Sequence, residues 1–236
     1  MCIATVKKLL STRMVPDQAI ELIVKSIYSI SLSKGEILDL EPSQTFLVSV
    51  DYGLIGEFFH FGEEREICSS LFTTGTIIPF KRSATYYSGE SSRLEALQNS
   101  SIFVVPRKSN FIENYLDYLD IAADDIYKFF VSYSRELILL RAALSAEDYM
   151  IFFILIYCTS SCKFNKKSYI TADLLSKVTG CTRQYANKVV FNLCSLGALN
   201  RESGKFFINN KELLIDKVDP LLYKKFYKPC CSTILV

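Results

Sequence analysis

The stretch of sequence that decides the fold is residues 169–199, YITADLLSKVTGCTRQYANKVVFNLCSLGAL. Thr171 and Thr182 each precede apolar residues at helical spacing, and threonine is a favourable N-cap because its hydroxyl oxygen accepts from an early backbone amide. Gly180 lies between the two runs, where a tight reversal requires a residue without a Cβ. The stretch therefore predicts two helices joined by a tight turn, the second covering about residues 182–195.

The second helix is predicted to have a buried face and a face that can contact nucleic acid. Its buried stripe is expected to consist of Ala186, Val189, Val190 and Leu193. Its outward side chains are donors and cations: Thr182, Arg183, Gln184, Asn187 and Lys188. Arginine suits guanine and glutamine suits adenine in the major groove, whereas threonine and lysine can contact phosphates. We therefore expect a recognition helix; the alternative is a helical hairpin with a solvated charged face.

A β-hairpin is predicted directly after this helix. Residues 198–201 and 205–208 flank Ser203 and Gly204, a dipeptide that favours a two-residue hairpin turn. Lys205, at the tip, would approach the DNA backbone. A helix, a turn, a second helix and a hairpin in this order predict a winged helix-turn-helix.

Charge is divided unevenly along the chain. The net charge is +2, but residues 160–236 contain thirteen Lys and Arg against five Asp and Glu, a net +8, while residues 1–159 have a net −6. Such an asymmetry suggests that the C-terminal part meets a polyanion. The cations expected to support phosphate affinity are Lys163, Lys166, Lys167, Lys177, Arg183, Lys188 and Lys205. Double-stranded DNA is therefore the expected partner.

A long helix with a regular apolar seam is predicted ahead of this domain. Apolar residues alternate at spacings of four and three: Leu119, Ala123, Ile126, Phe130, Tyr133, Leu137, Leu140 and Leu144. A seam of this length suits pairing with an identical helix, so we expect a homodimer with the larger of these side chains at its interface. The alternative is an amphipathic helix packed on its own domain. Ser145 is a favourable N-cap for a further helix, and a hinge is expected at Leu144–Ser145.

Residues 30–105 consist of short runs of β-branched and aromatic residues separated by glycines, which predicts a small all-β sandwich or barrel. One or two short helices are expected before it, over residues 3–26, with a break at Pro16–Asp17. The fold class is therefore α+β: an N-terminal β-roll, a long dimerisation helix and a C-terminal winged helix-turn-helix. The expected bounds are residues 1–110 for the roll and its helices, 111–144 for the dimerisation helix and 145–236 for the DNA-binding domain.

Residues 180–188, GCTRQYANK, resemble the recognition element Gly-Cys-Ser-Arg-Glu-Thr-Val-x-Arg of the Crp/Fnr family of bacterial transcription regulators. The order of elements is similar to that family over almost the whole chain. The resemblance implies a dimeric regulator with a cyclic-nucleotide-binding-like jelly roll, a palindromic operator, and contact with RNA polymerase if it activates. It places Arg183, Gln184 and Lys188 where the family contacts bases or phosphates. Gln184 in place of glutamate favours adenine over cytosine.

The resemblance also implies a sensor in the roll, but the known signatures differ here. Members that bind cyclic nucleotides resemble one another in a Gly-Glu and Arg-Ser/Thr-Ala cassette that holds the phosphate. Here residues 75–80 read GTIIPF, without the glutamate and with a proline in place of an amide donor; residues 82–84 fall too early and Arg93 is displaced. Only Cys2 and Cys68 precede residue 150, so an iron–sulfur cluster is not expected. We expect an unidentified effector, and the dense aromatic residues of the roll either line its pocket or fill the core.

No catalytic or metal site and no cofactor are predicted. His60 is the only histidine, and no nucleophile motif accompanies it. Cys158, Cys162 and the adjacent pair Cys230–Cys231 lack zinc-site spacing and are interpreted as reduced thiols, with a redox role left open. The longest apolar run, residues 150–158, is too short to span a membrane, so we expect a soluble, cytoplasmic protein. The alternative function is a protein-interaction module that kept the fold, or a redox-responsive regulator without a small-molecule ligand.

Overall fold

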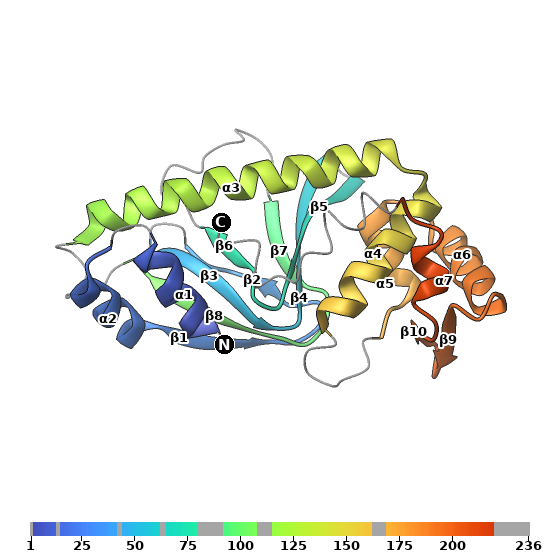
Figure 1. Ribbon diagram of the computed structural model, residues 1–236, viewed down its shortest axis with the longest axis horizontal. Helices are drawn as coiled ribbons and strands as arrows, with labels where there is room; N and C mark the ends of the chain where they lie inside the picture. The colour runs from blue at the N-terminus through green and yellow to red at the C-terminus, as the bar shows by residue number, and fades with distance from the viewer. Residues whose placement is uncertain are drawn as a thin grey trace.

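Two four-stranded sheets form the N-terminal half of the chain (Figure 1). The computed structural model describes residues 2–12, 15–41, 44–61, 65–79, 92–107, 115–161 and 169–219. The first sheet has the order β1 (Tyr28–Leu32), β8 (Ser100–Pro106), β3 (Thr45–Tyr52) and β6 (Ile77–Pro79). The second has the order β2 (Ile37–Leu38), β7 (Ser92–Ala96), β4 (Leu54–Phe61) and β5 (Arg65–Thr73). Every pairing among these described strands is antiparallel, in agreement with the predicted β-roll.

The register of the first sheet is fixed by apolar pairs inside the roll. Side chains alternate along a strand, so every second residue of β3 and β8 points to the same face. Val48 lies opposite Val104 and Val50 opposite Ile102, and all four are completely buried. Phe72 of the second sheet belongs to the same apolar cluster. A shift of one residue would turn these side chains out of this cluster to the other face of β3, which is also buried, so the match of the apolar pairs favours this register.

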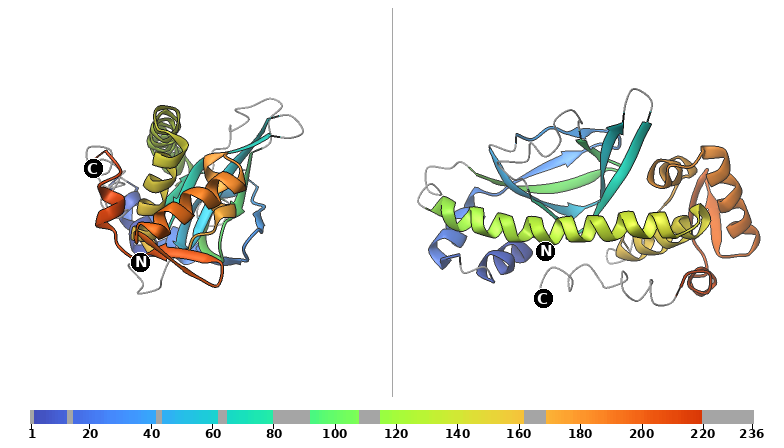
Figure 2. Two further views of the ribbon diagram at one scale, coloured as in Figure 1. Left: turned by 90° about the vertical axis from the view of Figure 1, so that its right-hand side faces the viewer. Right: turned by 90° about the horizontal axis from the view of Figure 1, so that it is seen from above.

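The helices lie along the roll and beyond one end of it (Figures 1 and 2). The helices and the last two strands are α1 (Cys2–Ser11), α2 (Asp17–Ser26), α3 (Leu116–Ala143), α4 (Ala146–Ser161), α5 (Ala172–Thr179), α6 (Arg183–Ser195), β9 (Leu199–Glu202), β10 (Lys205–Ile208) and α7 (Glu212–Ile215). α3 runs along the sheets, and α5, α6 and the β9–β10 hairpin follow past its C-terminal end. The predicted cap of α4 is confirmed, because the Ser145 hydroxyl oxygen accepts from the Asp148 amide at 3.1 Å.

One apolar core joins the roll to the C-terminal helices. Every residue from 150 to 155 in α4 is buried, so this part of the helix has no solvent face. The same cluster contains Leu54, Phe58 and Leu97 of the roll together with residues of α3, α5 and α6. The core is thus continuous across the boundary expected between residues 144 and 145. None of the described helices is both long and apolar enough to cross a membrane.

Replacing Ile154 by alanine is expected to lower the free energy of unfolding by about 2–5 kcal/mol, because it leaves a cavity in this shared core. Ile37→Ala is the matched control, since Ile37 is 54% exposed on β2 and has little burial to lose. Urea unfolding followed by circular dichroism measures both. Equal losses for the two variants would contradict this placement of the core.

Candidate nucleic-acid interface

Two caps and a glycine turn hold α5 and α6 in place. The Thr171 hydroxyl oxygen accepts from the Leu174 amide at 3.1 Å, and that of Thr182 accepts from the Tyr185 amide at 3.2 Å. Both predicted N-caps are therefore confirmed. Gly180 has φ +67°, in the left-handed region, and its amide closes the last turn of α5. The direction in which α6 leaves α5 is thus set by local hydrogen bonds.

α6 presents the predicted contact residues on its exposed face. The predicted stripe is confirmed, because all four of its members are buried: Ala186, Val189, Val190 and Leu193. The exposed side chains are Thr182, Arg183, Gln184, Asn187 and Lys188. A hydroxyl oxygen that accepts from a backbone amide can still donate its own hydrogen, so the cap role of Thr182 is compatible with a phosphate contact. Cationic and amide donors are therefore gathered in the first half of one exposed helix face.

The β9–β10 hairpin carries the remaining predicted residue, Lys205. Ser203 and Gly204 have φ +49° and +75°, the two positive values that a type I′ turn requires. Lys205 directly follows this turn and is exposed. Ile170 and Phe206 exchange two backbone hydrogen bonds of 2.8 Å, which anchor the hairpin to the segment before α5. Lys205 thus lies at the tip of a braced hairpin.

Tyr169 supports this tip and was not predicted. Its hydroxyl donates to Glu202 Oε2 at 3.0 Å, and this hydrogen bond raises the pKa of Tyr169. Its ring packs edge-on against Phe207 at 6.0 Å and lies 5.8 Å from Lys205 Nζ. The ring therefore favours one position of the Lys205 ammonium group. The sequence does not reveal this role, because the residues that Tyr169 contacts lie more than thirty positions away, on the hairpin.

α6 also exposes aromatic side chains that the sequence left unassigned. Phe191 is 60% exposed and Tyr185 is 38% exposed. Phe191 follows Lys188 by three residues and Gln184 by seven, which places the three on one helix face. An aromatic ring there can contact thymine methyl groups in a major groove. The spacing of Phe191 from Gln184 and Lys188 can be read from the sequence. Phe191 was not predicted as a contact residue because an aromatic residue in an amphipathic helix usually lies in the core.

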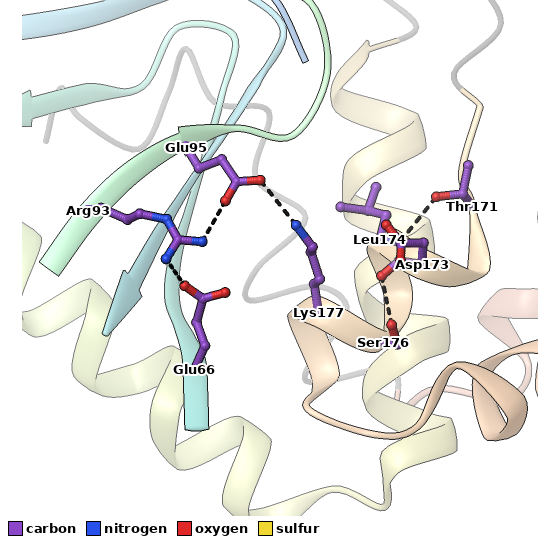
Figure 3. A network of polar contacts seen from close by, with 8 residues as sticks. All are labelled: Glu66, Arg93, Glu95, Thr171, Asp173, Leu174, Ser176 and Lys177. Carbon is purple, nitrogen blue, oxygen red and sulfur yellow. Dashed lines mark hydrogen bonds and ion pairs between the residues drawn. The ribbon is translucent and has the colours of Figure 1, made fainter. Parts of the chain in front are cut away.

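Lys177 departs from its predicted role. Its Nζ lies 3.1 Å from Oε1 of Glu95, on β7 of the roll (Figure 3). The prediction that Lys177 adds phosphate affinity is therefore corrected, because a carboxylate of the roll already pairs with it. Lys163, Lys166 and Lys167 lie outside the described residues.

Arg141 ties α3 to the same region. Its Nη1 donates to the Cys68 carbonyl of β5 at 3.3 Å, and its Nη2 donates to the Thr179 carbonyl of α5 at 3.0 Å. Thr179 is the last residue of α5, so the guanidinium contacts a carbonyl at the negative end of the helix. A Cβ on Gly180 would lie 2.4 Å from Arg141 Nη2. The turn glycine therefore also makes room for the arginine.

Arg93 is held by acidic partners within the roll. It forms ion pairs with Glu66 and, at 2.8 Å, with Glu95 (Figure 3). Burial raises the pKa of Glu95, but hydrogen bonds from Arg93 and Lys177 outweigh it and hold the pKa below its ordinary value. The guanidinium of Arg93, which is displaced from its place in the family's phosphate cassette, is thus engaged by two carboxylates. Residues 82–84 lie outside the described part of the chain.

The described thiols and acids form no metal centre. Within the ranges that the structure describes, no group of three or more His, Cys, Asp or Glu side chains could hold a metal ion. Cys68 is buried, and that burial raises its pKa to about 12. The side chains of His60, Cys158, Cys162, Cys230 and Cys231 are not among those described.

The exposed apolar side chains of α3 differ from the predicted seam. Ile126 and Leu140 are buried in apolar clusters of their own chain, and Leu144 is half-buried against one of them. The assignment of Ile126 and Leu140 to a dimer interface is therefore corrected, because these clusters supply apolar partners within the chain. Among the side chains of α3 that the structure describes, the large exposed apolar ones are Tyr118, Ile121, Val131, Ile138 and Leu139. The side chains of four further predicted residues are not described: Leu119, Phe130, Tyr133 and Leu137.

Comparison with known proteins rests on structure. No protein-family model matches the sequence, and no curated protein matches it. FixK2 from Bradyrhizobium japonicum has a TM-score of 0.60 and 14% identity, covering 82% of this chain and 98% of that one. CLP, the c-di-GMP responsive global regulator of Xanthomonas campestris, has a TM-score of 0.59 and 13% identity, covering 81% and 98%. A transcriptional regulator of the CRP/FNR family from Thermus thermophilus has a TM-score of 0.53 and 15% identity, covering 80% and 97%. At these low sequence identities the similarity is one of fold. The chain has the fold of the Crp/Fnr family of transcriptional regulators.

Proposed function

We propose that the protein is a homodimeric, sequence-specific DNA-binding transcription regulator. The observation that carries this proposal is the exposed face of α6, where Arg183, Gln184, Asn187 and Lys188 follow the cap Thr182. The opposite face of the same helix is buried, so these donors are presented on a rigid element. With the turn at Gly180 and the β9–β10 hairpin, α5 and α6 form a winged helix-turn-helix in which α6 is the recognition helix.

Base edges and phosphates are contacted by different side chains in this proposal. Arg183, Gln184 and Asn187 read base edges in the major groove, where forked and amide donors discriminate between base pairs. Thr182, Lys188 and Lys205 contact phosphates and set the position of the domain on the duplex. Lys205 reaches the backbone from the hairpin, to one side of the recognition helix.

The dimer forms through α3. Ile121, Val131, Ile138 and Leu139 expose apolar surface along this helix, and pairing with a second copy would remove it from water. Pairing through the seam that the sequence predicts, with Leu119, Phe130, Tyr133, Leu137 and Leu144, is the alternative, because its heptad spacing places it on the side of α3 that carries the buried Ile126 and Leu140. A two-fold dimer binds a palindrome whose half-sites are about 10 base pairs apart. An effector in the roll would act by changing the arrangement of the two recognition helices, and an activating member would also contact RNA polymerase.

A protein-interaction module is the second candidate function. It is favoured by the exposed apolar side chains Tyr185 and Phe191 of α6 and Leu196 directly after it. On DNA, Phe191 would lie in the groove; in an interaction module it would lie against another protein.

Selection of bound duplexes from a random DNA pool tests these alternatives. Affinity for the selected duplexes is then measured at two salt concentrations. Enrichment of a palindrome with half-sites about 10 base pairs apart is expected for a dimeric DNA reader. Absence of any enriched sequence would contradict sequence-specific binding and favour the interaction module.

Single substitutions are expected to separate base reading from phosphate contact. Arg183→Ala should weaken operator binding by about 1–3 kcal/mol and relax the base preference at one position of each half-site. Lys205→Ala should weaken binding to all sequences alike and lower the salt slope by about one. Lys217→Ala is the control, as an exposed lysine of the same half of the chain. Fluorescence anisotropy at several salt concentrations measures these effects, and identical behaviour of the two variants on all sequences would show that Arg183 contacts only phosphate.

Ile138→Asp is expected to convert the dimer to a monomer, because pairing would then bury an unpaired carboxylate. Ile37→Asp is the matched control, since Ile37 and Ile138 are both 54% exposed but lie on β2 and α3 respectively. Sedimentation velocity distinguishes the two states. Retention of the dimer by Ile138→Asp at micromolar protein would refute pairing through this face of α3.

A further inference from the structure

The roll and the recognition half of the chain are joined by an ion pair between a buried carboxylate, Glu95, and a lysine, Lys177, whose side chain is 38% exposed. Lys177 Nζ of α5 lies 3.1 Å from Glu95 Oε1 of β7, and the Glu95 side chain is only 9% exposed. The two residues are 82 positions apart in the sequence. The contact is both an ion pair and a charge-assisted hydrogen bond between the roll and α5, so it favours one placement of α5 against the roll.

The carboxylate of this pair is itself held in position. Arg93 donates to Glu95 Oε2 at 2.8 Å and also pairs with Glu66 of β5 (Figure 3). Each oxygen of Glu95 thus has its own cationic partner. Because Arg93 and Glu95 lie on β7 and Glu66 on β5 of the same sheet, Lys177 meets a carboxylate whose orientation is fixed by the roll rather than by solvent.

Arg141 provides a second, independent contact to α5. Its two donors join the carbonyl of Cys68 on β5 to the carbonyl of Thr179 at the C-terminus of α5. Lys177 and Thr179 are close along α5, but Lys177 pairs with Glu95 of β7 whereas Thr179 accepts from Arg141 of α3, so the two contacts restrain α5 from different elements. Apolar contact adds a third restraint, because Leu174 and Leu175 belong to the same cluster as Leu54 and Phe58 of the roll.

These contacts also fix α6. Only Gly180, Cys181 and Thr182 separate the two helices, and α5 and α6 share one buried core. A side chain at Gly180 would displace the Arg141 guanidinium, so the hydrogen bond from Arg141 to Thr179 depends on the glycine in this turn. The position of the recognition helix relative to α3 therefore follows from where α5 is held.

We propose that Glu95, Lys177 and Arg141 form a latch that sets the distance and angle between the two recognition helices, and so determines which half-site spacing the dimer accepts. The inference rests on the proposed function, because it requires α3 at the two-fold axis and α6 on DNA. Lys177 and Arg141 are positioning residues, which act on DNA recognition through the placement of α6. Changing the spacing by one base pair turns one half-site by about 35° relative to the other, so a rigidly held pair of helices must discriminate against it.

The experiment uses the full-length protein and the palindrome obtained by selection, together with palindromes whose spacing is one base pair longer or shorter and a duplex with a single half-site. The measured quantity is the spacing ratio, the affinity for the selected palindrome divided by that for each altered one. The wild type is expected to show a ratio of about ten, comparable to one mismatched base pair. In Lys177→Met and in Glu95→Gln the ratio is expected to fall by about fivefold, a typical lower value for coupling between sites.

A change in net charge cannot by itself lower the spacing ratio in both variants. Lys177→Met removes a positive charge and Glu95→Gln a negative one, so a general electrostatic effect on DNA affinity would have opposite signs in the two variants. The latch predicts that both variants lower the ratio, that Lys177→Arg keeps it, and that the double variant lowers it no further than either single one. Lys217→Met is the control for loss of one positive charge. Circular dichroism and affinity for the single half-site confirm that the variants are folded.

The outcomes separate the latch from the function on which it rests. Loss of spacing discrimination with retained half-site affinity supports the latch. Wild-type spacing ratios in both variants, or a uniform rise in affinity at every spacing, would overturn it while leaving the DNA-binding proposal intact. A wild-type protein that binds no palindrome more tightly than random duplex would overturn both.

Discussion

The burial of α4 between the roll and the C-terminal helices is the constraint on which the candidate interface depends. A helix without a solvent face needs apolar partners all round, and here the roll supplies one side while α5 and α6 supply another. Apolar contact is strong but has little direction, so it holds these elements together without fixing their angles. Direction comes from the polar contacts at the edge of this core, those of Lys177 and Arg141. Apolar side chains thus hold the C-terminal helices against the roll, and polar side chains set the angle between them.

Local signals allowed much of the candidate interface to be predicted from the sequence. Thr171, Gly180 and Thr182 act on backbone groups within four residues, so their roles follow from the residue types at those positions. The buried stripe of α6 and the turn of the hairpin are likewise short-range features. Glu95 and Tyr169 could not be found in this way, because their partners lie elsewhere in the fold.

The helix α3 shows why a periodic pattern does not identify the partner that covers it. Its sequence has an apolar seam at heptad spacing, and the pattern is the same whether the seam meets a second copy or the same chain. The structure places Ile126 and Leu140, two heptads apart, inside the chain, while Val131 and Ile138, one heptad apart, stay exposed. Apolar residues on two faces serve two partners, and only the arrangement of the roll and α4 decides which face is covered within the chain.

The shared core also bears on how the chain is made. Leu54, Phe58 and Leu97 are synthesised well before α4, so the apolar surface of the roll exists when α4 leaves the ribosome. A fragment that starts at Ser145 would lack this surface, and the sides of α4 and α5 that meet the roll would face water. Apolar surface exposed in this way promotes aggregation. Residues from Ser145 onward are therefore expected to be less stable without the roll than with it.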